Sequence, residues 1–303
     1  MTKSNLHSKS GNKVLNDFIV GGVSAAISKT CVAPIERVKI ILQVQANTKN
    51  LPAHKKYDGI IDCFVKVTQK QGFWSLWRGN LINVMRYFPT QALNFACKEK
   101  FKQYLNPYNR KEEPVKFFAG NVLSGSAAGA TSLCVVYPLD FARTRLAADS
   151  GKEASREFIG FVDCLTKILK SDGPVGLYRG LPISLLGIVF YRGAYFGLYD
   201  TGHAFLFSSS KQDSFFKMWA FAQVTTTLAN LFSYPLDTVR RRLMMQSGEA
   251  NKAYTGTMDC FNKIYQKEGP RGFFKGGASN IIRSTGGALV LVFYSKIQTY
   301  MEL

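Results

Sequence analysis

Long apolar segments alternate with shorter polar segments along the chain. The apolar segments lie at 18–33, 81–97, 117–137, 181–198, 216–234 and 281–293. With a few flanking residues, each reaches the roughly 20 residues that a helix needs to cross a bilayer. The pattern predicts an all-α membrane protein with six transmembrane helices and with both termini on one side of the membrane.

Four short motifs recur with a common period. The proline motifs PIERVK, PLDFAR and PLDTVR begin at Pro34, Pro138 and Pro235, at intervals of 104 and 97 residues. The triplets WRG, YRG and FKG, the triplets YDG, FIG and YTG, and an Asp-Cys dipeptide each recur at intervals of 101 and 96 residues. We therefore predict one integrated transmembrane domain of three tandem repeats with pseudo-three-fold symmetry, at 14–112, 113–211 and 212–303, after a flexible N-terminal tail at 1–13.

Polar residues interrupt the apolar segments, and this decides between two interpretations. A soluble helical repeat protein is one alternative, because the hydropathy signal is weak. However, Lys29, Arg86, Arg192 and Arg283 lie within otherwise apolar stretches, and small residues cluster nearby in GGVSAA and GSAAG. Ionisable residues inside spans usually face a water-filled cavity, and small residues let membrane helices approach closely. We expect six helices around a polar cavity, with a short amphipathic helix in each repeat between its two spans.

Each proline motif carries an acid and a base three residues apart. The acids are Glu36, Asp140 and Asp237, and the bases are Lys39, Arg143 and Arg240. This spacing places both charges on nearly the same helix face, where an acid can meet a base of the next repeat. The expected ring pairs Glu36 with Arg143, Asp140 with Arg240, and Asp237 with Lys39. Such a ring would act as a gate across the cavity floor, whereas the alternative is three ordinary ion pairs at solvated helix ends.

One depth in the repeats combines two arginines with a glycine. Nine residues after the aromatic residue of the WRG, YRG and FKG triplets lie Arg86, Gly187 and Arg283. Two guanidinium groups at one depth suit a polyphosphate, because each can bind phosphate oxygens in bidentate fashion. No acidic residue lies in the same apolar stretch to pair with either arginine. We predict that both bind phosphate, with Lys29 as a further contact.

The glycine of this layer leaves room for a flat base. Gly187 and Ile188 would line an apolar slot, and Tyr191 and Tyr195 follow with a spacing of four residues on the same helix face. Their rings would guide the base by stacking. Close helix packing at Gly187, and anchoring of the tyrosines at the membrane interface, remain open as alternatives.

The charge balance and the other motifs restrict the function further. The chain has 39 Lys and Arg against 20 Asp and Glu, a net charge of +19, which favours anionic partners. Its six cysteines and three histidines show no metal-ligand spacing, and there is no phosphate-loop signature, catalytic nucleophile or paired-carboxylate site. We expect no metal, no cofactor and no enzymatic activity. A nucleic-acid-binding protein would cluster basic residues on one exposed face, whereas here they follow the repeat, so we expect no nucleic-acid partner.

The three proline motifs resemble the signature of the mitochondrial carrier family, Pro-x-[Asp/Glu]-x-x-[Lys/Arg], and the resemblance covers nearly the whole chain. Within that family, the chain most resembles the branch that exchanges ADP for ATP. Three stretches carry this resemblance: AISKTCVAPIERVK at 26–39, NVMRYFPTQALNFA at 83–96 and YPLDFARTRLA at 137–147. That branch has three arginines followed by three methionines, and this chain has Arg240, Arg241, Arg242, Leu243, Met244 and Met245. Leu and Met have similar volumes, so the departure at Leu243 is minor. Relatives that carry phosphate, coenzyme A or another nucleotide should lack the arginine triplet and the Arg–Gly–Arg layer.

The resemblance implies an antiporter of the mitochondrial inner membrane. Its termini would face the intermembrane space, its short helices the matrix, and one central site would open alternately to each side of a monomer. ADP and ATP would contact the residues that match the family's site, namely Lys29, Arg86, Gly187, Ile188, Tyr191, Arg192, Ser233 and Arg283.

The aromatic-glycine triplets are expected to begin short helices, whose free backbone donors bind phosphate. In the family these are cardiolipin sites. The matching residues here are Gly59, Trp77, Arg78, Gly79, Gly160, Tyr178, Arg179, Gly180, Gly256, Phe274, Lys275 and Gly276.

The family also places a second acid–base motif near the cytoplasmic end of each even-numbered span. Here the three positions hold Glu99 with Lys102, Asp200 with His203, and Ser295 with Gln298. Only the first keeps both charges, and a histidine near its reference pKa of about 6.5 is mostly neutral at pH 7. We predict a cytoplasmic gate weaker than the matrix gate, and a carrier that rests open toward the cytoplasm.

Overall fold

The computed structural model describes residues 3–45, 57–109, 112–149, 156–206, 215–249 and 251–286, and within these ranges the chain forms helices and no strand. The long helices are α1 (Lys3–Val44), α3 (Asn80–Leu105), α4 (Pro114–Ala148), α6 (Leu181–Leu206) and α7 (Phe215–Met245). The backbone is helical again at 277–286, at the start of the sixth apolar segment. The chain is therefore all-α, as the pattern predicts, and each apolar segment falls on a helix as far as it is described.

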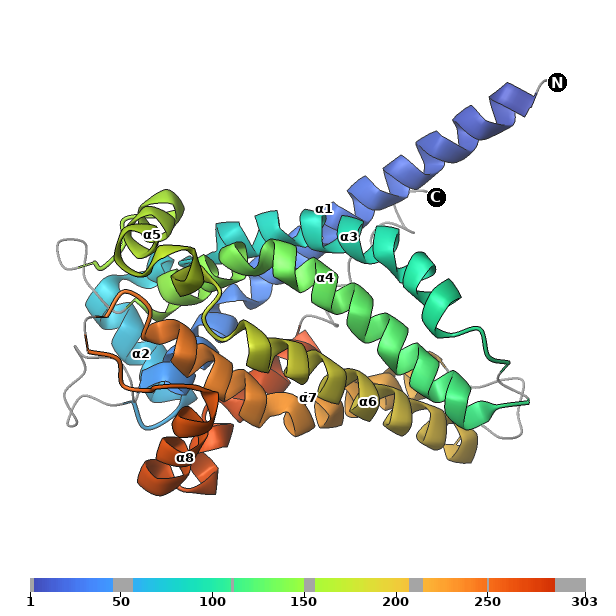
Figure 1. The fold of residues 1–303 in the computed structure, drawn as a ribbon. Helices are drawn as coiled ribbons and strands as arrows, with labels where there is room; N and C mark the ends of the chain where they lie inside the picture. The colour runs from blue at the N-terminus through green and yellow to red at the C-terminus, as the bar shows by residue number, and fades with distance from the viewer. Residues whose placement is uncertain are drawn as a thin grey trace.

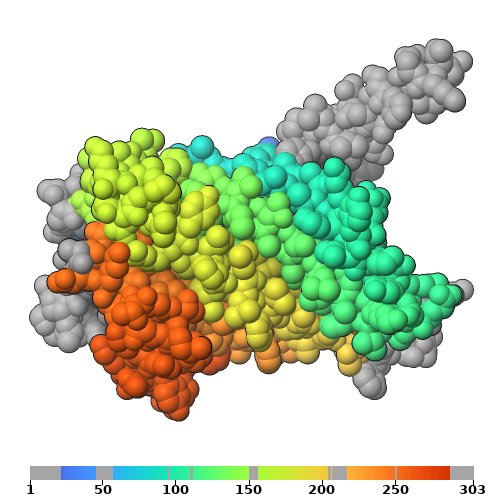
Figure 2. Space-filling model, in the orientation of Figure 1, coloured from blue at the N-terminus to red at the C-terminus, as the bar shows by residue number. Residues whose placement is uncertain are grey.

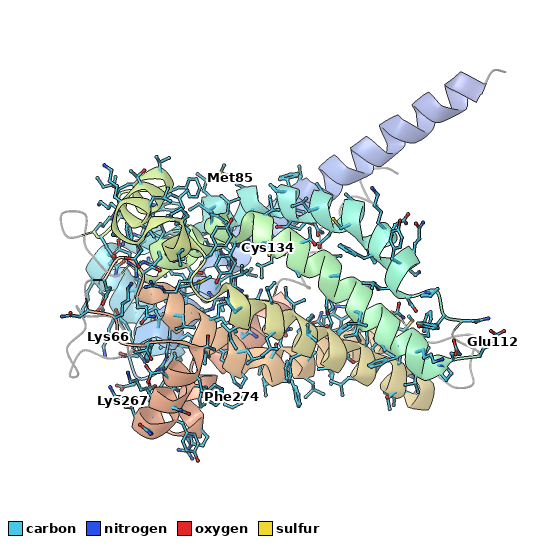
Figure 3. The ribbon with its side chains drawn as sticks, in the orientation of Figure 1. Lys66, Met85, Glu112, Cys134, Lys267 and Phe274 are labelled. Atoms are coloured by element: carbon cyan, nitrogen blue, oxygen red, sulfur yellow. The ribbon has the colours of Figure 1, made fainter. Side chains whose placement is uncertain are left out.

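The short helices lie together at one end of the bundle (Figure 1). They are α2 (Ile60–Gln71), α5 (Phe161–Leu177) and α8 (Thr257–Glu268), and the 3₁₀ turns η3 (Phe73–Trp77) and η5 (Pro270–Phe274) follow α2 and α8. In α5 the corresponding break is a kink at Gly173, where φ is 66°. Figure 2 shows α5 and α8 projecting at this end of the surface. In Figure 3, Lys66 and Lys267 lie here, and Glu112 lies at the opposite end.

The N-terminal stretch 1–13 lies mostly on the first helix, and its flexibility stays a prediction. The helix α1 begins at Lys3, so most of the stretch 1–13 has a helical backbone. No proline precedes Pro34, so nothing in the covalent backbone forces an earlier break. This first part of α1 projects beyond the other helices (Figure 1).

The signature prolines lie inside the odd-numbered helices of the repeats. Pro34 is within α1, Pro138 within α4 and Pro235 within α7, and each helix continues for at least two further turns. Because proline lacks the amide hydrogen, each of these helices loses one backbone hydrogen bond at this point. The acid–base motifs thus lie on the segments that follow the three prolines.

Two described helices meet the length and composition of a membrane span. The stretches are Pro114–Ala148 in α4 and Leu181–His203 in α6, both with a mean hydropathy of 1.4. Only 11% of the apolar stretch of α6 is buried inside the protein, so most of its side chains are not enclosed in a core. Six spans remain a prediction, because the other long helices carry more polar residues.

Buried apolar clusters join each odd-numbered helix of the repeats to its short helix. Cys63 of α2 packs with Val38 and Ile41 of α1, and the other repeats build the same kind of cluster around Cys164 and Cys260. The core is therefore concentrated at the end of the bundle with the short helices, where it holds the three proline motifs in place.

Candidate functional site

The predicted ion-pair ring is present in the structure. Glu36 of α1 pairs with Arg143 of α4, Asp140 of α4 with Arg240 of α7, and the Oδ2 atom of Asp237 lies 3.1 Å from Nζ of Lys39. All three pairs join different repeats, so the ring links α1, α4 and α7. The repeat spacing placed each acid near a base of another repeat, and the structure contains the three predicted pairs.

One carboxylate of the ring also binds a cation that the sequence analysis assigned to phosphate. An Nη1 atom of Arg86 lies 3.0 Å from Oδ1 of Asp140, and Arg143 lies 3.9 Å from the same oxygen. Arg86 thus has an acidic partner from outside its own apolar stretch, and its contact with phosphate stays a prediction. The apolar stretch around Arg86 contains no acid, whereas Asp140 reaches it from the neighbouring helix α4.

Amide and arginine side chains extend the ring. Asn83 donates to Glu36 at 3.1 Å, and Lys39 donates to Asn280 at 3.0 Å. Gln43 donates to Asp237 at 3.3 Å, and Arg241 lies 3.1 Å from the same carboxylate. The three acids thus receive unequal numbers of donors.

Two of the three bases also lie over tyrosine rings. The guanidinium of Arg240 is 5.3 Å from the ring centre of Tyr137, and Nζ of Lys39 is 5.1 Å from that of Tyr234, within range for a cation–π interaction. Ala33 stands at the matching position of the first repeat. The pair of Glu36 with Arg143 therefore has no tyrosine at that position.

The ring borders a central cavity of about 440 Å³ between α1, α3, α4, α6, α7 and the helix at 277–286. Seven predicted substrate residues line it: Arg86, Gly187, Ile188, Tyr191, Arg192, Ser233 and Arg283. The lining holds seven cationic side chains against the three carboxylates of the ring, an excess of four positive charges. Such a cavity attracts a multiply charged anion and holds its phosphate groups near the ring.

The other two predicted substrate residues lie beside the cavity lining. The ammonium group of Lys29 is 5.2 Å from the ring centre of Tyr87, the residue after Arg86. The ring of Tyr195 stacks on those of Tyr191 and Tyr199, with centres 6.1 and 5.9 Å apart. These rings form a ladder along α6.

Several polar lining residues were not predicted. They include Thr90 and Asn94 on α3, Ser132 on α4, and Asn230 on α7. Helical spacing could have identified some of them, because Thr90 lies four residues after Arg86 and Asn230 three residues before Ser233.

The arginine triplet divides into three environments. Arg240 belongs to the ring, Arg241 lines the cavity beside Asp237, and Arg242 pairs with Glu268 of α8. Leu243, Met244 and Met245 are all buried. Leu243 packs against Cys260 and Ile264 of α8, so an apolar side chain of either shape suits this position.

The two sets of aromatic-glycine triplets have different structural roles. Gly59, Gly160 and Gly256 directly precede the short helices α2, α5 and α8, as expected. The WRG and YRG triplets instead precede the long helices α3 and α6, and FKG precedes the helix at 277–286. The expectation of short helices there is wrong, because the last glycine of each triplet turns the chain directly into the next apolar segment.

These last glycines pack closely on the neighbouring repeat. Gly79, Gly180 and Gly276 have φ values of 81°, 88° and 80°. A Cβ atom on each would lie 3.0 Å from the carbonyl oxygen of Arg143, Arg240 and Lys39, respectively. Each triplet therefore touches the backbone of a base of the ring.

The remaining triplet side chains make contacts within the protein. Trp77 donates to the Thr30 carbonyl, Tyr178 stacks on Tyr137, and Phe274 stacks on Tyr234. Arg78 donates to the Asp149 carbonyl and Arg179 to the Gln246 carbonyl, each at 3.3 Å, and Lys275 pairs with Glu268. A lipid phosphate at these triplets would thus be bound chiefly by backbone amides.

The recurring Asp-Cys dipeptide has a structural role in the short helices. Asp62, Asp163 and Asp259 each pair with a lysine four residues later at 2.8 Å, and this interaction lowers the pKa of each carboxyl. Burial raises the pKa of Cys63, Cys164 and Cys260 to about 12. Buried thiols of this kind are unreactive, which agrees with a packing role.

The predicted cytoplasmic gate lies only partly within the described residues. Glu99 and Lys102 are exposed near the end of α3, and the ring of His203 lies 5.8 Å from that of Tyr199 on α6. Ser295 and Gln298 lie outside the described residues. The weakness of this gate therefore stays a prediction.

Three repeats that share one cationic cavity and close its end with ion pairs between them form the architecture of a carrier for anions. The family described as mitochondrial carrier protein matches the chain three times, at residues 10–109, 114–210 and 211–303. The chain belongs to the mitochondrial carrier family.

Relatives in several organisms are similar over nearly their full length. The chain is 55% identical to the mitochondrial substrate carrier family protein ancA of Dictyostelium discoideum, over 98% of this chain and 97% of the relative. It is 56% identical to ADP/ATP translocase 4 of Homo sapiens, over 95% and 91% of the two chains. It is 58% identical to ADP/ATP translocase 2 of Rattus norvegicus, over 94% and 96%.

Proposed function

We propose that the protein exchanges ADP for ATP across the mitochondrial inner membrane, through the central cavity, which opens alternately to the two sides. It is a transporter rather than an enzyme. The observation that carries the proposal is the excess of four positive charges around a cavity of about 440 Å³. Identity of 55–58% to ADP/ATP translocases supports the choice of nucleotide.

Arg86 connects substrate binding to the ring. Its guanidinium lies 3.0 Å from Asp140. Phosphate oxygens that enter the cavity compete with this carboxylate for Arg86, because a guanidinium binds both in the same bidentate geometry. Phosphate binding then leaves Asp140 with fewer cations and weakens its part of the ring. Opening of the floor would thus depend on the presence of substrate.

The base and the phosphates would occupy different parts of the cavity. Arg86 and Arg283 bind phosphate near the ring, and Lys29, whose ammonium group lies over Tyr87, guides phosphate past the helix α1. Gly187 and Ile188 leave an apolar slot for adenine, and the tyrosine ladder of α6 stacks on the base as it moves. Aromatic stacking is worth about 1–3 kcal/mol per base.

The proposed carrier is a monomer of six spans. The ring closes the matrix side, the termini face the intermembrane space, and the weaker Glu99, Asp200 and His203 positions belong to the cytoplasmic gate. Cardiolipin phosphates bind the backbone amides that begin α2, α5 and α8, with the glycine triplets opposite them. A helix N-terminus favours such anions through its unpaired amides and its dipole.

Exchange in liposomes tests the proposal. Vesicles that contain the purified protein and internal ATP should take up labelled ADP, whereas vesicles without internal nucleotide should not. Internal phosphate or coenzyme A should not support uptake. Arg283→Ala should abolish exchange yet leave a folded protein, because it removes a phosphate contact worth about 2–5 kcal/mol. Equal uptake with phosphate or coenzyme A inside the vesicles would overturn the assignment.

A further inference from the structure

An asparagine of the cavity is unused by the proposed mechanism. Asn230 of α7 lines the cavity one helical turn before Ser233. Its Nδ2 atom donates to the backbone carbonyl of Thr226 at 2.9 Å. A carbonyl oxygen can only accept, so this bond fixes which end of the amide is the nitrogen. Within the described part of the chain, no group donates a hydrogen bond to Oδ1 of Asn230.

The depth of Asn230 matches the base rather than the phosphates. The helices α6 and α7 lie side by side and run in opposite directions (Figure 1), and Gly187 faces Leu236. Asn230 is six residues before Leu236, so it is level with a point six residues beyond Gly187. That point lies between Tyr191 and Tyr195, whose rings are stacked 6.1 Å apart. A purine guided by these rings would present an edge to α7.

This part of α7 offers hydrogen-bond acceptors. Besides Oδ1 of Asn230, the hydroxyl of Ser233 donates its hydrogen to the Asn230 carbonyl at 3.3 Å and keeps its lone pairs for the cavity. Adenine carries an amino group at its 6-position, which donates, whereas guanine carries a carbonyl oxygen there, which accepts. An acceptor in the protein therefore favours adenine and opposes guanine at that position.

We infer that Asn230 is a specificity-determining residue, and that its Oδ1 atom accepts a hydrogen bond from the 6-amino group of the adenine base. The inference rests on the proposed exchange of adenine nucleotides and adds a residue that distinguishes adenine from other bases. To accommodate a 6-oxo purine, the amide would have to flip and give up its bond to Thr226. The phosphate-binding residues are unaffected, because they lie deeper, near the ring.

The test compares purine nucleotides with different groups at the 6-position. Liposomes loaded with ATP take up labelled ADP in competition with unlabelled ADP, inosine diphosphate, or the diphosphate of purine riboside, which has no substituent at this position. The wild-type protein should prefer ADP to purine riboside diphosphate by about 10-fold, the effect of one net hydrogen bond. Asn230→Ala should reduce this preference to about 2-fold or less.

Two further variants separate recognition from a general structural effect. Asn230→Asp keeps an acceptor, so it should keep the preference for ADP although its charge repels phosphate and lowers overall uptake. Asn94→Ala removes the same kind of side chain from α3, elsewhere in the cavity lining, and should keep the wild-type preference.

The outcomes distinguish the inference from the proposed function. If wild-type vesicles exchange ADP for ATP but Asn230→Ala keeps the full preference for the 6-amino group, the assignment of Asn230 is wrong and the exchange stands. An equal loss in Asn94→Ala would also overturn it. If the wild-type protein exchanges no adenine nucleotide, the proposed function itself fails.

Discussion

Neutralising the three acids of the ring one at a time should destabilise the protein in a fixed order. Asp140 has three cations within 4.0 Å, namely Arg86, Arg143 and Arg240. Asp237 has two, Lys39 and Arg241, and Glu36 has one, Arg143. We predict that the loss decreases from Asp140→Asn to Asp237→Asn to Glu36→Gln.

The magnitude follows from the cations that each change leaves behind. Removing one partner of a buried ion pair costs about 3–5 kcal/mol, because the other charge stays uncompensated. Asp140→Asn leaves Arg86 and Arg240 without an acid and removes one of the two acids near Arg143, so it should reach the upper end of that range. Glu36→Gln should cost about 2–3 kcal/mol, because Arg143 keeps Asp140 nearby and Asn83 can still bond the new amide.

Thermal unfolding of the detergent-solubilised protein measures the order. At about 2–4 °C per kcal/mol, Asp140→Asn should lower the apparent midpoint by roughly 10 °C or more, and Glu36→Gln by about half as much. Glu113→Gln is the matched control, since its exposed pair with Lys116 should contribute almost nothing. Equal losses for Asp140→Asn and Glu36→Gln, or the reverse order, would refute the reasoning.

A reciprocal charge swap tests the pairing itself. Asp140→Lys should impair exchange by placing like charges together, and adding Arg240→Asp should restore part of it. Restoration should be incomplete, because Arg86 also lies 3.0 Å from Asp140 and would then face a lysine. If every reciprocal swap in the ring fails although the variants are produced normally, the pairing does not operate as a gate.

Three further changes probe the surroundings of the ring. Tyr234→Phe should lower the free energy of unfolding by about 1 kcal/mol, because it removes the hydrogen bond to the Lys275 carbonyl. Tyr234→Leu should lower it further, because the aromatic ring under Lys39 is lost as well. Equal unfolding midpoints for the two variants would contradict this. Gly180→Ala should destabilise the protein by about 1–2 kcal/mol and lower the midpoint, because alanine is strained at a positive φ. Gly160→Ala is the control and should leave the midpoint unchanged, because this position is open and has a φ of −169°. A thiol reagent at pH 7 should leave the Cys63 position unmodified in the folded protein and label it on heating, because burial raises its pKa to about 12; rapid labelling of the folded form would show that the helix α2 opens.

The ring was predictable because its chemistry repeats along the chain. An acid and a base at constant spacing, with one period, leave few ways to pair across three helices, and the structure contains the three expected pairs. The cavity lining was partly predictable for the same reason, since Arg86, Gly187 and Arg283 share one position in the repeat.

The contacts that depend on helix rotation and tilt were not predictable. Arg86 reaches Asp140 across a helix interface, and Asn230 faces the cavity, although neither has a counterpart of like chemistry in all three repeats. The role of Gly79 was missed too. A glycine motif in sequence indicates only that the backbone is unusual there, whereas the structure shows that its packing partner is the Arg143 carbonyl.

The close contact of each glycine with the next repeat limits how the floor can open. Gly79 touches the Arg143 backbone, and Tyr137, which lies under Arg240, donates its hydroxyl to the carbonyl of Arg179, the residue before Gly180. Because the glycine contacts involve the backbone of each base, a shift of the helix that separates a base from its acid also disturbs this packed turn. Interiors packed at this density move as units rather than deform continuously. In the proposed mechanism, phosphate that competes for the cations of Asp140 acts on one helix interface, and the shared turns would carry the displacement to the other two repeats, so that the floor would open as a whole.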